Sequence, residues 1–356
     1  MVYPHILLDS NKLTHNTRVI CAQAAKYGIK IAGVTKACLA NPAVAKAMAA
    51  GGVCELADSR IENLARLKDL QLNIPLLLLR SPGLSQIKDT IELADTSLNS
   101  QYEVMAQLAA EARRQGKIHQ VIVMVDLGDL REGVLPKEVV PMAKELVLTR
   151  GLKLRGIGAN FACYGGVRPS VANLGELITL ARELEAAINQ KIEVVSGGNS
   201  SSLELLFQAK IPVGVTHLRI GEGILLGRET IQRKALPRMH QDAFSLRAEV
   251  VEVQVKTSVP KGEIGQDAFG CRPSFSDTGP MLRAIVAIGR QDVPLDGIFP
   301  LEADLRVIGA SSDHLIIDAA KKPGIRVGDT IHFGLNYAGL LGAMTSPFVS
   351  KRVKDW

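Results

Sequence analysis

Short apolar runs alternate with amphipathic stretches from about residue 30 to about residue 220. Runs rich in β-branched residues predict buried strands, and apolar positions that recur every three to four residues predict helices. Eight strands separated by helices favour a (β/α)8 TIM barrel over an open doubly wound sheet. The predicted strands are 29–36, 52–57, 75–80, 95–99, 119–126, 154–161, 192–198 and 215–221, and the clearest helices are 101–115, 137–149, 171–189 and 201–210.

One further helix is predicted in LADSRIENLARLKDL, which starts at Leu56. Ser59 and Glu62 have the spacing of a capping box, so we interpret both as helix caps rather than as catalytic groups.

The pattern changes after about residue 240. Strand-like runs are separated by Gly, Pro and Asp, and helical periodicity nearly disappears. We therefore expect a barrel over residues 10–235 and a mostly β C-terminal domain over residues 236–356. The strand-like opening, within residues 2–9, precedes a helix rather than a barrel strand pair, which makes it a candidate to join the β domain across the chain.

Composition excludes several functional classes. The chain has 356 residues, 47% of them hydrophobic, which is enough for one large and one smaller domain. Its net charge of +6 is spread without a dense basic block, and one tryptophan and five tyrosines offer little for base stacking, so no nucleic-acid partner is expected. No run of about 18 apolar residues and no leader pattern occurs, so we expect a cytoplasmic protein without a membrane partner. The five cysteines form no CxxC pair, which supports neither a disulfide framework nor a metal site.

Polar residues follow the predicted barrel strands where active sites of such barrels lie, at the carboxyl ends. Lys36 ends an apolar strand, although lysine is rarely buried without a partner or a reaction. It either emerges into solvent or does chemistry. The other residues expected at the same mouth are Arg131, Asn160, Asn199, Ser200, Arg219 and Gly221.

The run SGGNSSSLELLF, which begins at Ser196, combines glycines, hydroxyls and a helix start, as a phosphate site requires. Serines are also common helix caps, and that alternative stays open for Ser200. A phosphate site facing a lysine suggests pyridoxal 5'-phosphate, whose aldehyde reacts with a lysine amine. Partial burial of Lys36 in its apolar strand would lower the pKa of that amine.

The chain resembles the fold-type III pyridoxal-phosphate enzymes of the alanine racemase superfamily, and within them the ornithine racemase-like amino-acid racemases. The resemblance covers nearly the whole chain. It rests on GVTKA, LADSRIENL, VDLGDLREGV, SGGNSSSLELL, HLRIGEGILLG, GEIGQDAFG, AIGRQD, GASSDHLIID and LNYAGLLGAMTSPFVSK.

The resemblance implies roles for individual residues. Lys36 would form the Schiff base and act as acid/base on one face of the cofactor. Ser200, the Gly221 backbone and Tyr337 would hold the phosphate, with Tyr337 supplied by the second subunit of a head-to-tail homodimer. Arg219 would donate to the pyridine nitrogen and leave it unprotonated. Arg131 would bind the substrate carboxylate.

Each role has a structural alternative. Arg219 could form an ion pair at the barrel rim, and Arg131 could pair with Glu132 or Asp129. Tyr337 could be a core tyrosine in a strand.

The sequence also departs from the family. Ala37, Cys38 and Leu39 follow the lysine where the family has a phosphate-binding tyrosine. Asn160 replaces the histidine that stacks on the cofactor, and Met124 replaces a lysine that many members carbamylate. Arg290 aligns with the opposing tyrosine base, and arginine is no routine base at neutral pH.

A two-base racemase then needs another acid/base. His314 has a suitable intrinsic pKa, and its neighbour Asp313 is a second candidate for that role or for binding a distal substrate ammonium. Cys163 is a third, with a buried core cysteine as its alternative. Glu222 and Asp267 are further candidates for the distal ammonium.

These observations predict an isomerase that racemises a small-molecule amino acid, with ornithine or lysine favoured over alanine. A decarboxylase on the same scaffold and a non-catalytic cofactor-binding homeostasis protein remain as alternatives.

Overall fold

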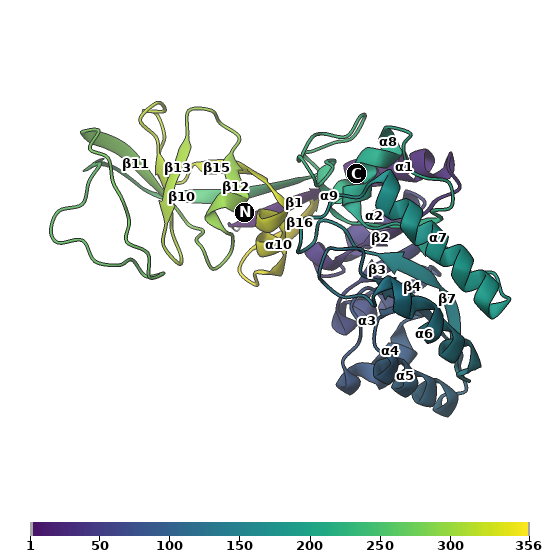
Figure 1. Cartoon of the computed structure of the whole chain (residues 1–356). Coiled ribbons are helices and arrows are strands. Elements are labelled where there is room, and N and C mark those ends of the chain that lie inside the picture. The colour runs from purple at the N-terminus through teal and green to yellow at the C-terminus, as the bar shows by residue number, and fades with distance from the viewer. Residues whose placement is uncertain (1–2, 355–356) are drawn as a thin grey trace. The chain divides into compact units, whose positions relative to one another are not determined.

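The structure is a computed structural model that describes residues 3–354. It contains two compact units (Figure 1). The first comprises residues 10–241 and therefore extends past residue 235, where the sequence pattern placed its end. The second comprises residues 242–354 together with the N-terminal residues 3–9.

The first unit is the predicted (β/α)8 TIM barrel, and this expectation is confirmed. Eight strands close on themselves, and every neighbouring pair is parallel. The strands are β2 (Lys30–Val34), β3 (Glu55–Asp58), β4 (Leu76–Leu78), β5 (Thr96–Asn99), β6 (His119–Val125), β7 (Leu152–Ala159), β8 (Val194–Ser196) and β9 (His217–Ile220).

Helices surround these strands, as Figure 1 shows for α3 to α7. Those expected from periodicity appear with shifted ends, and the helix expected after the N-terminal strand is α1. Helices α2, α4 and α9, of five to nine residues, were not predicted. The helices are α1 (Ser10–Ala25), α2 (Pro42–Ala50), α3 (Ile61–Asp69), α4 (Ile87–Leu93), α5 (Tyr102–Arg114), α6 (Pro136–Leu148), α7 (Val171–Ile188), α8 (Leu203–Phe207) and α9 (Glu222–Leu226).

The predicted capping box at Ser59 and Glu62 is wrong. Helix α3 begins at Ile61, and no side chain caps it from Arg60. Asp58, at the end of β3, instead accepts hydrogen bonds from the backbone N–H groups of Ser59 and Arg60, at 2.7 and 3.1 Å. A carboxylate is a stronger acceptor than a serine hydroxyl, which explains why Asp58 organises this turn.

The second unit is mostly β, as predicted. Its strands run in the order β12-β15-β10-β11-β14-β13, and β1 pairs antiparallel with β10 and parallel with β16. One helix, α10 (Tyr337–Thr345), lies in a region where no helix was expected. The strands are β1 (His5–Asp9), β10 (Phe244–Thr257), β11 (Pro280–Val286), β12 (Ile298–Pro300), β13 (Arg306–Ala310), β14 (Leu315–Asp318), β15 (Thr330–Leu335) and β16 (Ser350–Lys354).

Within residues 3–354, no helix combines the length and apolar character that crossing a bilayer demands.

Candidate active site

All eight barrel strands are parallel, so their carboxyl ends lie on one face of the barrel. Lys36 lies there, two residues after the end of β2, and starts a short 3₁₀ turn (Lys36–Cys38). Its side chain is exposed, so the expected partial burial in the strand is wrong. The strand ends before the lysine, and the turn carries the amine out of the apolar wall.

Asp58 fixes the base of this turn. Its side chain is fully buried, and it accepts a 2.7 Å hydrogen bond from the hydroxyl of Thr35, the residue before Lys36. Asn63 donates to the same carboxylate at 3.0 Å. Burial nevertheless raises the pKa of Asp58, because it outweighs these hydrogen bonds. Sequence analysis missed this residue, although an acid at the end of a predicted barrel strand was a usable signal.

Arg219 lies inside the barrel on β9 and is almost fully buried. Its guanidinium donates to the hydroxyl of Ser196, to the carbonyl of Ala159 at 2.9 Å and to the side-chain oxygen of Asn160 at 2.8 Å. All three acceptors are neutral, and among residues 3–354 Arg219 forms no ion pair. The rim ion pair is therefore not what holds it. Burial lowers the pKa of Arg219 to about 10.

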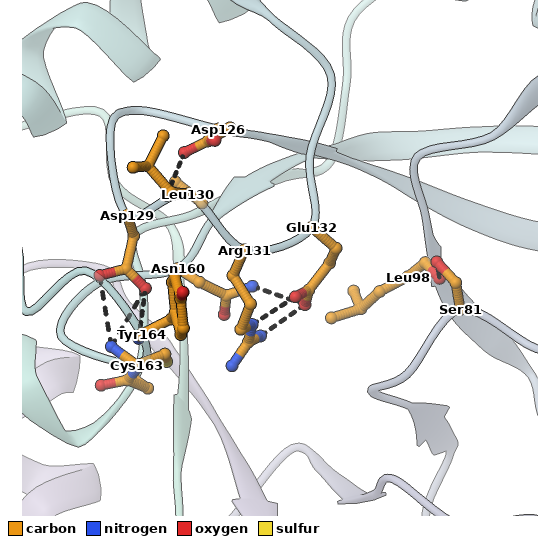
Figure 2. A network of polar contacts seen from close by, with 12 residues as sticks. Ser81, Leu98, Asp126, Asp129, Leu130, Arg131, Glu132, Asn160, Cys163 and Tyr164 are labelled. Carbon is orange, nitrogen blue, oxygen red and sulfur yellow. Dashed lines mark hydrogen bonds and ion pairs between the residues drawn. The ribbon is translucent and has the colours of Figure 1, made fainter.

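Asn160 links Arg219 to a second pair of charges, Glu132 and Arg131, and Figure 2 shows the contacts among Asn160, Glu132 and Arg131. Its amide nitrogen donates to Glu132 at 2.9 Å, and Glu132 also accepts from the Nε and Nη2 groups of Arg131. The expected alternative for Arg131, a pair with Glu132, is thus present in the structure. Glu132 adds a carboxylate to the mouth that sequence analysis mentioned only as a neighbour of Arg131.

Asp129 does not contact Arg131 by hydrogen bond or ion pair in the described chain; it organises the loop after β7 (Figure 2). Its buried carboxylate accepts from the backbone N–H groups of Cys163 and Tyr164, both at 3.1 Å. Cys163 is exposed, so its interpretation as a core cysteine is wrong. Desolvation of its sulfur raises the pKa of the thiol, while Arg131, Lys36 and Arg219 lower it. Charges from three different strand ends therefore act at one sulfur.

The glycine-rich run after β8 lies beside the end of β9. Ser200 is buried, and its hydroxyl accepts a 3.1 Å hydrogen bond from the N–H of Gly223. A Cβ added at Gly221 would lie 3.2 Å from Cβ of Val34 and 3.3 Å from its carbonyl oxygen, so only glycine leaves this approach unobstructed. Asn199 braces the run, because its side chain donates to the carbonyl of Phe161 at 2.8 Å and accepts from the N–H of Ser201 at 2.8 Å.

The β domain holds Asp313 and His314 in an exposed loop before β14, not in a strand. Asp313 accepts a 3.0 Å hydrogen bond from the side chain of Gln291, and the backbone N–H of His314 donates to Ser311 at 3.0 Å. Both side chains are accessible to a molecule that approaches this loop.

Tyr337 is partly buried at the start of α10, so its interpretation as a core tyrosine in a strand is wrong. Its neighbour Asn336 donates to the carbonyl of Asp296 at 2.7 Å. The segment 289–297 therefore contacts both the Asp313 loop and the start of α10. This segment lines a cavity of about 700 Å³. Arg290, which belongs to the segment, lines the cavity too, and its guanidinium lies 4.5 Å from the centre of the Phe269 ring.

The remaining candidates for a distal ammonium already have partners. Glu222 pairs with Arg233, and burial raises its pKa. Asp267 accepts from the N–H groups of Phe269 and Cys271, both at 2.9 Å. Three residues that differ from the family pattern are buried and pack in the core. They are Ala37 and Cys38, which follow Lys36, and Met124.

Two curated relatives match the chain over nearly its whole length. It is 42% identical to the ornithine racemase of Acetoanaerobium sticklandii, over 99% of this chain and 100% of that protein. It is 38% identical to the lysine racemase of Thermotoga maritima, over 99% and 98% of the two chains. Residues 8–229 match the family described as alanine racemase, N-terminal domain.

Solved structures of alanine racemases share the fold. The enzyme from a D-cycloserine-producing Streptomyces lavendulae superposes with a TM-score of 0.81 at 16% identity, covering 100% of this chain and 98% of that one. The enzyme of Bartonella henselae, solved with covalently bound pyridoxal phosphate, gives 0.77 at 17% identity, covering 99% of this chain and 100% of that one.

Proposed function

Because the chain belongs to the alanine racemase family, we propose that it is a pyridoxal-phosphate-dependent racemase that interconverts the L and D forms of a basic amino acid, ornithine or lysine. The observation that carries the proposal is the buried Arg219, which has only neutral hydrogen-bond partners at the mouth where Lys36 exposes its amine. The two curated relatives, named for ornithine and lysine, support the basic substrate.

The residues present fit pyridoxal phosphate. Ser200 supplies a hydroxyl beside the Gly221 backbone, where a Cβ would crowd Val34, and Lys36 supplies the amine. Arg219 supplies a donor that remains cationic at neutral pH, because even its lowered pKa of about 10 lies well above 7. Asn160 is held by both Arg219 and Glu132, so its amide is fixed at the same mouth. When bound, the cofactor withdraws electrons from the substrate and so acidifies its α-proton.

The chain's own groups would then move that proton. Lys36 accepts or returns it on one face of the α-carbon, and its exposed position lets the amine reach a molecule in the mouth. His314 performs the same exchange on the other face, with Asp313 as the alternative, supplied from the β domain of a second subunit. The pKa of the Cys163 thiol is raised, which makes this residue the weaker candidate.

Substrate binding is assigned to charged groups. Glu132 accepts hydrogen bonds from the Nε and Nη2 groups of Arg131. We assign the third nitrogen, Nη1, to the substrate carboxylate. Asp313 is exposed and is assigned to the distal ammonium. Tyr337 completes the phosphate site from the partner of a head-to-tail homodimer, and we expect the enzyme to be cytoplasmic.

Solvent exchange tests the proposal. Purified protein loaded with pyridoxal phosphate is incubated in deuterated water with single L-amino acids, and chiral separation with mass spectrometry follows both enantiomer formation and α-deuteration. We expect ornithine or lysine to be racemised and deuterated at least about tenfold faster than alanine. Loss of carbon dioxide without the opposite enantiomer would instead indicate a decarboxylase. Absence of α-deuteration across a broad panel would favour a non-catalytic homeostasis protein.

A further inference from the structure

A continuous chain of buried polar side chains runs behind Arg219. Ser196, which accepts from Arg219, lies 2.9 Å from Nδ1 of His217. The Nε2 of His217 lies 2.8 Å from a carboxylate oxygen of Glu55, a close contact that lacks the angle of a hydrogen bond, and Arg155 donates to the other oxygen at 2.8 Å. Ser196, His217 and Glu55 are each no more than 1% exposed.

This chain crosses the interior of the barrel. Arg155 lies on β7 and Glu55 on β3, and these strands are not neighbours in the closed sheet. Arg155 also donates to Thr96 on β5 at 3.1 Å. Contacts among β3, β5 and β7 can form only through the space that the strands enclose. His217 and Arg219 are two residues apart on β9 and so face the same side, which places the chain directly beneath the guanidinium.

The direction of the contacts in this chain is set by its two ends, a guanidinium that only donates and a carboxylate that only accepts. Arginine has no acceptor, so Arg219 must donate to the oxygen of Ser196. That oxygen has a second lone pair, so it is Glu55 that sets the tautomer of the ring. Nε2 lies 2.8 Å from an ionised carboxylate, which only accepts, so Nε2 carries the proton and Nδ1 of the neutral ring accepts from Ser196. Burial lowers the pKa of His217, which keeps the ring neutral at pH 7.

The chain also supplies a remote negative charge. Burial destabilises the cationic Arg219 and lowers its pKa, whereas Cys163, Glu132 and, as the smallest of the three, Glu55 raise it. Burial by itself raises the pKa of Glu55, but His217 and Arg155 outweigh it and hold the pKa at about 2. Glu55 is thus ionised at neutral pH.

A metal site is the competing explanation, because ligand atoms of Cys54, Glu55 and His217 lie within 4.8 Å of one another. The local charge argues against it. Arg155 already pairs with Glu55, and the cations Arg155 and Lys30 both act on Cys54. Burial raises the pKa of the Cys54 thiol to about 11, so a metal would have to displace a firmly held proton there.

We propose that Ser196, His217, Glu55 and Arg155 are positioning residues that orient the Arg219 guanidinium and hold it as a hydrogen-bond donor to the pyridine nitrogen of the cofactor. The inference rests on the proposed function, since it assigns Arg219 to that nitrogen. It adds a requirement that lies outside the mouth: the electronic state of the cofactor depends on a carboxylate at the opposite end of the barrel strands.

The same barrel contains a matched control. Ser97 on β5 lies 2.7 Å from Nε2 of His119 on β6, and both residues are at most 3% exposed. Neither residue bonds to a member of the Arg219 chain in the described structure. Replacing either serine by alanine removes one oxygen atom beside a buried histidine, so the two variants carry comparable structural damage.

The experiment compares Ser196→Ala with Ser97→Ala. Pyridoxal phosphate affinity is measured by titrating the apoprotein, and the absorbance spectrum of the bound cofactor is recorded from pH 6 to 9. We expect Ser196→Ala to weaken binding about tenfold and to change the spectrum or its pH dependence, because Arg219 loses an acceptor. Ser97→Ala should leave both unchanged. Equal spectra and affinities for the two variants would overturn the inference.

The apoprotein provides an independent measurement. Nitrogen-15 NMR of labelled histidine reports which ring nitrogen carries the proton, and comparison with His217→Gln assigns the resonances of His217. We expect a neutral ring protonated at Nε2; protonation at Nδ1 would contradict the direction of the chain. Wild-type protein that binds no pyridoxal phosphate would refute the proposed function itself, whereas wild-type binding with identical serine variants would refute only this inference.

Discussion

The two units present their candidate residues in different ways. In the barrel, Arg219 and Asn160 are buried and are held by several side-chain hydrogen bonds. In the β domain, Asp313 and His314 are exposed, and the backbone of their loop makes most of the contacts that hold it. The barrel half of the site is therefore preorganised, whereas the β-domain half remains accessible to a ligand or partner.

This difference predicts that barrel substitutions abolish function and that β-domain substitutions reduce it. The largest effect should come from Lys36→Ala. Removing the amine that the turn after β2 places at the mouth should lower α-deuteration by about 10³-fold or more and remove the long-wavelength absorbance of the bound cofactor.

Lys30→Ala is its matched control, since Lys30 is exposed at the opposite end of the same strand. It should retain the exchange rate of the wild type. If Lys36→Ala kept full activity and the absorbance, the assignment of the barrel mouth would be wrong.

Low pH should lower the free energy of unfolding, because it protonates Glu55 inside the barrel. Its pKa is lowered to about 2 in the folded protein, below the ordinary value of 4.5, so its stabilisation is complete above pH 4.5. As pH falls toward 2, the free energy of unfolding should fall by on the order of 2–3 kcal/mol. Urea unfolding at several pH values should therefore show a steep acid limb in the wild type and a flatter one in Glu55→Gln.

Glu111 is the surface counterpart. Hydrogen bonds from Arg114 and Gln115 lower its pKa to about 2 as well, but the site is exposed to solvent. The contribution of Glu111 to the free energy of unfolding should vanish in about 1 M salt, where charges are screened within about 3 Å. An acid limb of the wild type that salt abolishes completely would show that buried Glu55 is not its source.

The sequence was sufficient for the parts of the fold and site that follow from local pattern. All eight barrel strands could be predicted, because each is a short apolar run, and several residues at their ends followed from the rule that parallel strands end on one face, although Asp58 was missed. The interior chain could not. Glu55, Ser196 and His217 lie on three strands, and only closure of the barrel brings them together. The same limit applies to Glu132, which the sequence presents merely as a neighbour of Arg131.

In the β domain, His314→Gln should lower racemisation about 10²-fold, as expected for a lost acid/base. Asp313→Asn should instead raise KM for basic amino acids and leave kcat nearly unchanged, because it removes a charge that binds substrate. Initial rates in both directions separate the two effects. Normal racemisation by both variants would exclude the loop from catalysis and leave the second acid/base to another residue.

The smallest expected effect is that of Tyr337→Phe. A hydroxyl that donates to a charged phosphate contributes about 1.5 kcal/mol at the lower end of the usual range, so its loss should weaken pyridoxal phosphate binding by at least about tenfold. Tyr102→Phe, which removes an exposed hydroxyl from the start of α5, is the control and should bind the cofactor like the wild type. Since Tyr337 belongs to the β domain, the loss should appear only in the assembled dimer if the phenol comes from a partner. Titration of a mixed dimer, with one Tyr337→Phe subunit and one Lys36→Ala subunit, distinguishes the two arrangements. An intact phosphate site on the Lys36-containing barrel would support supply from the partner, and a defective one would support supply within the chain.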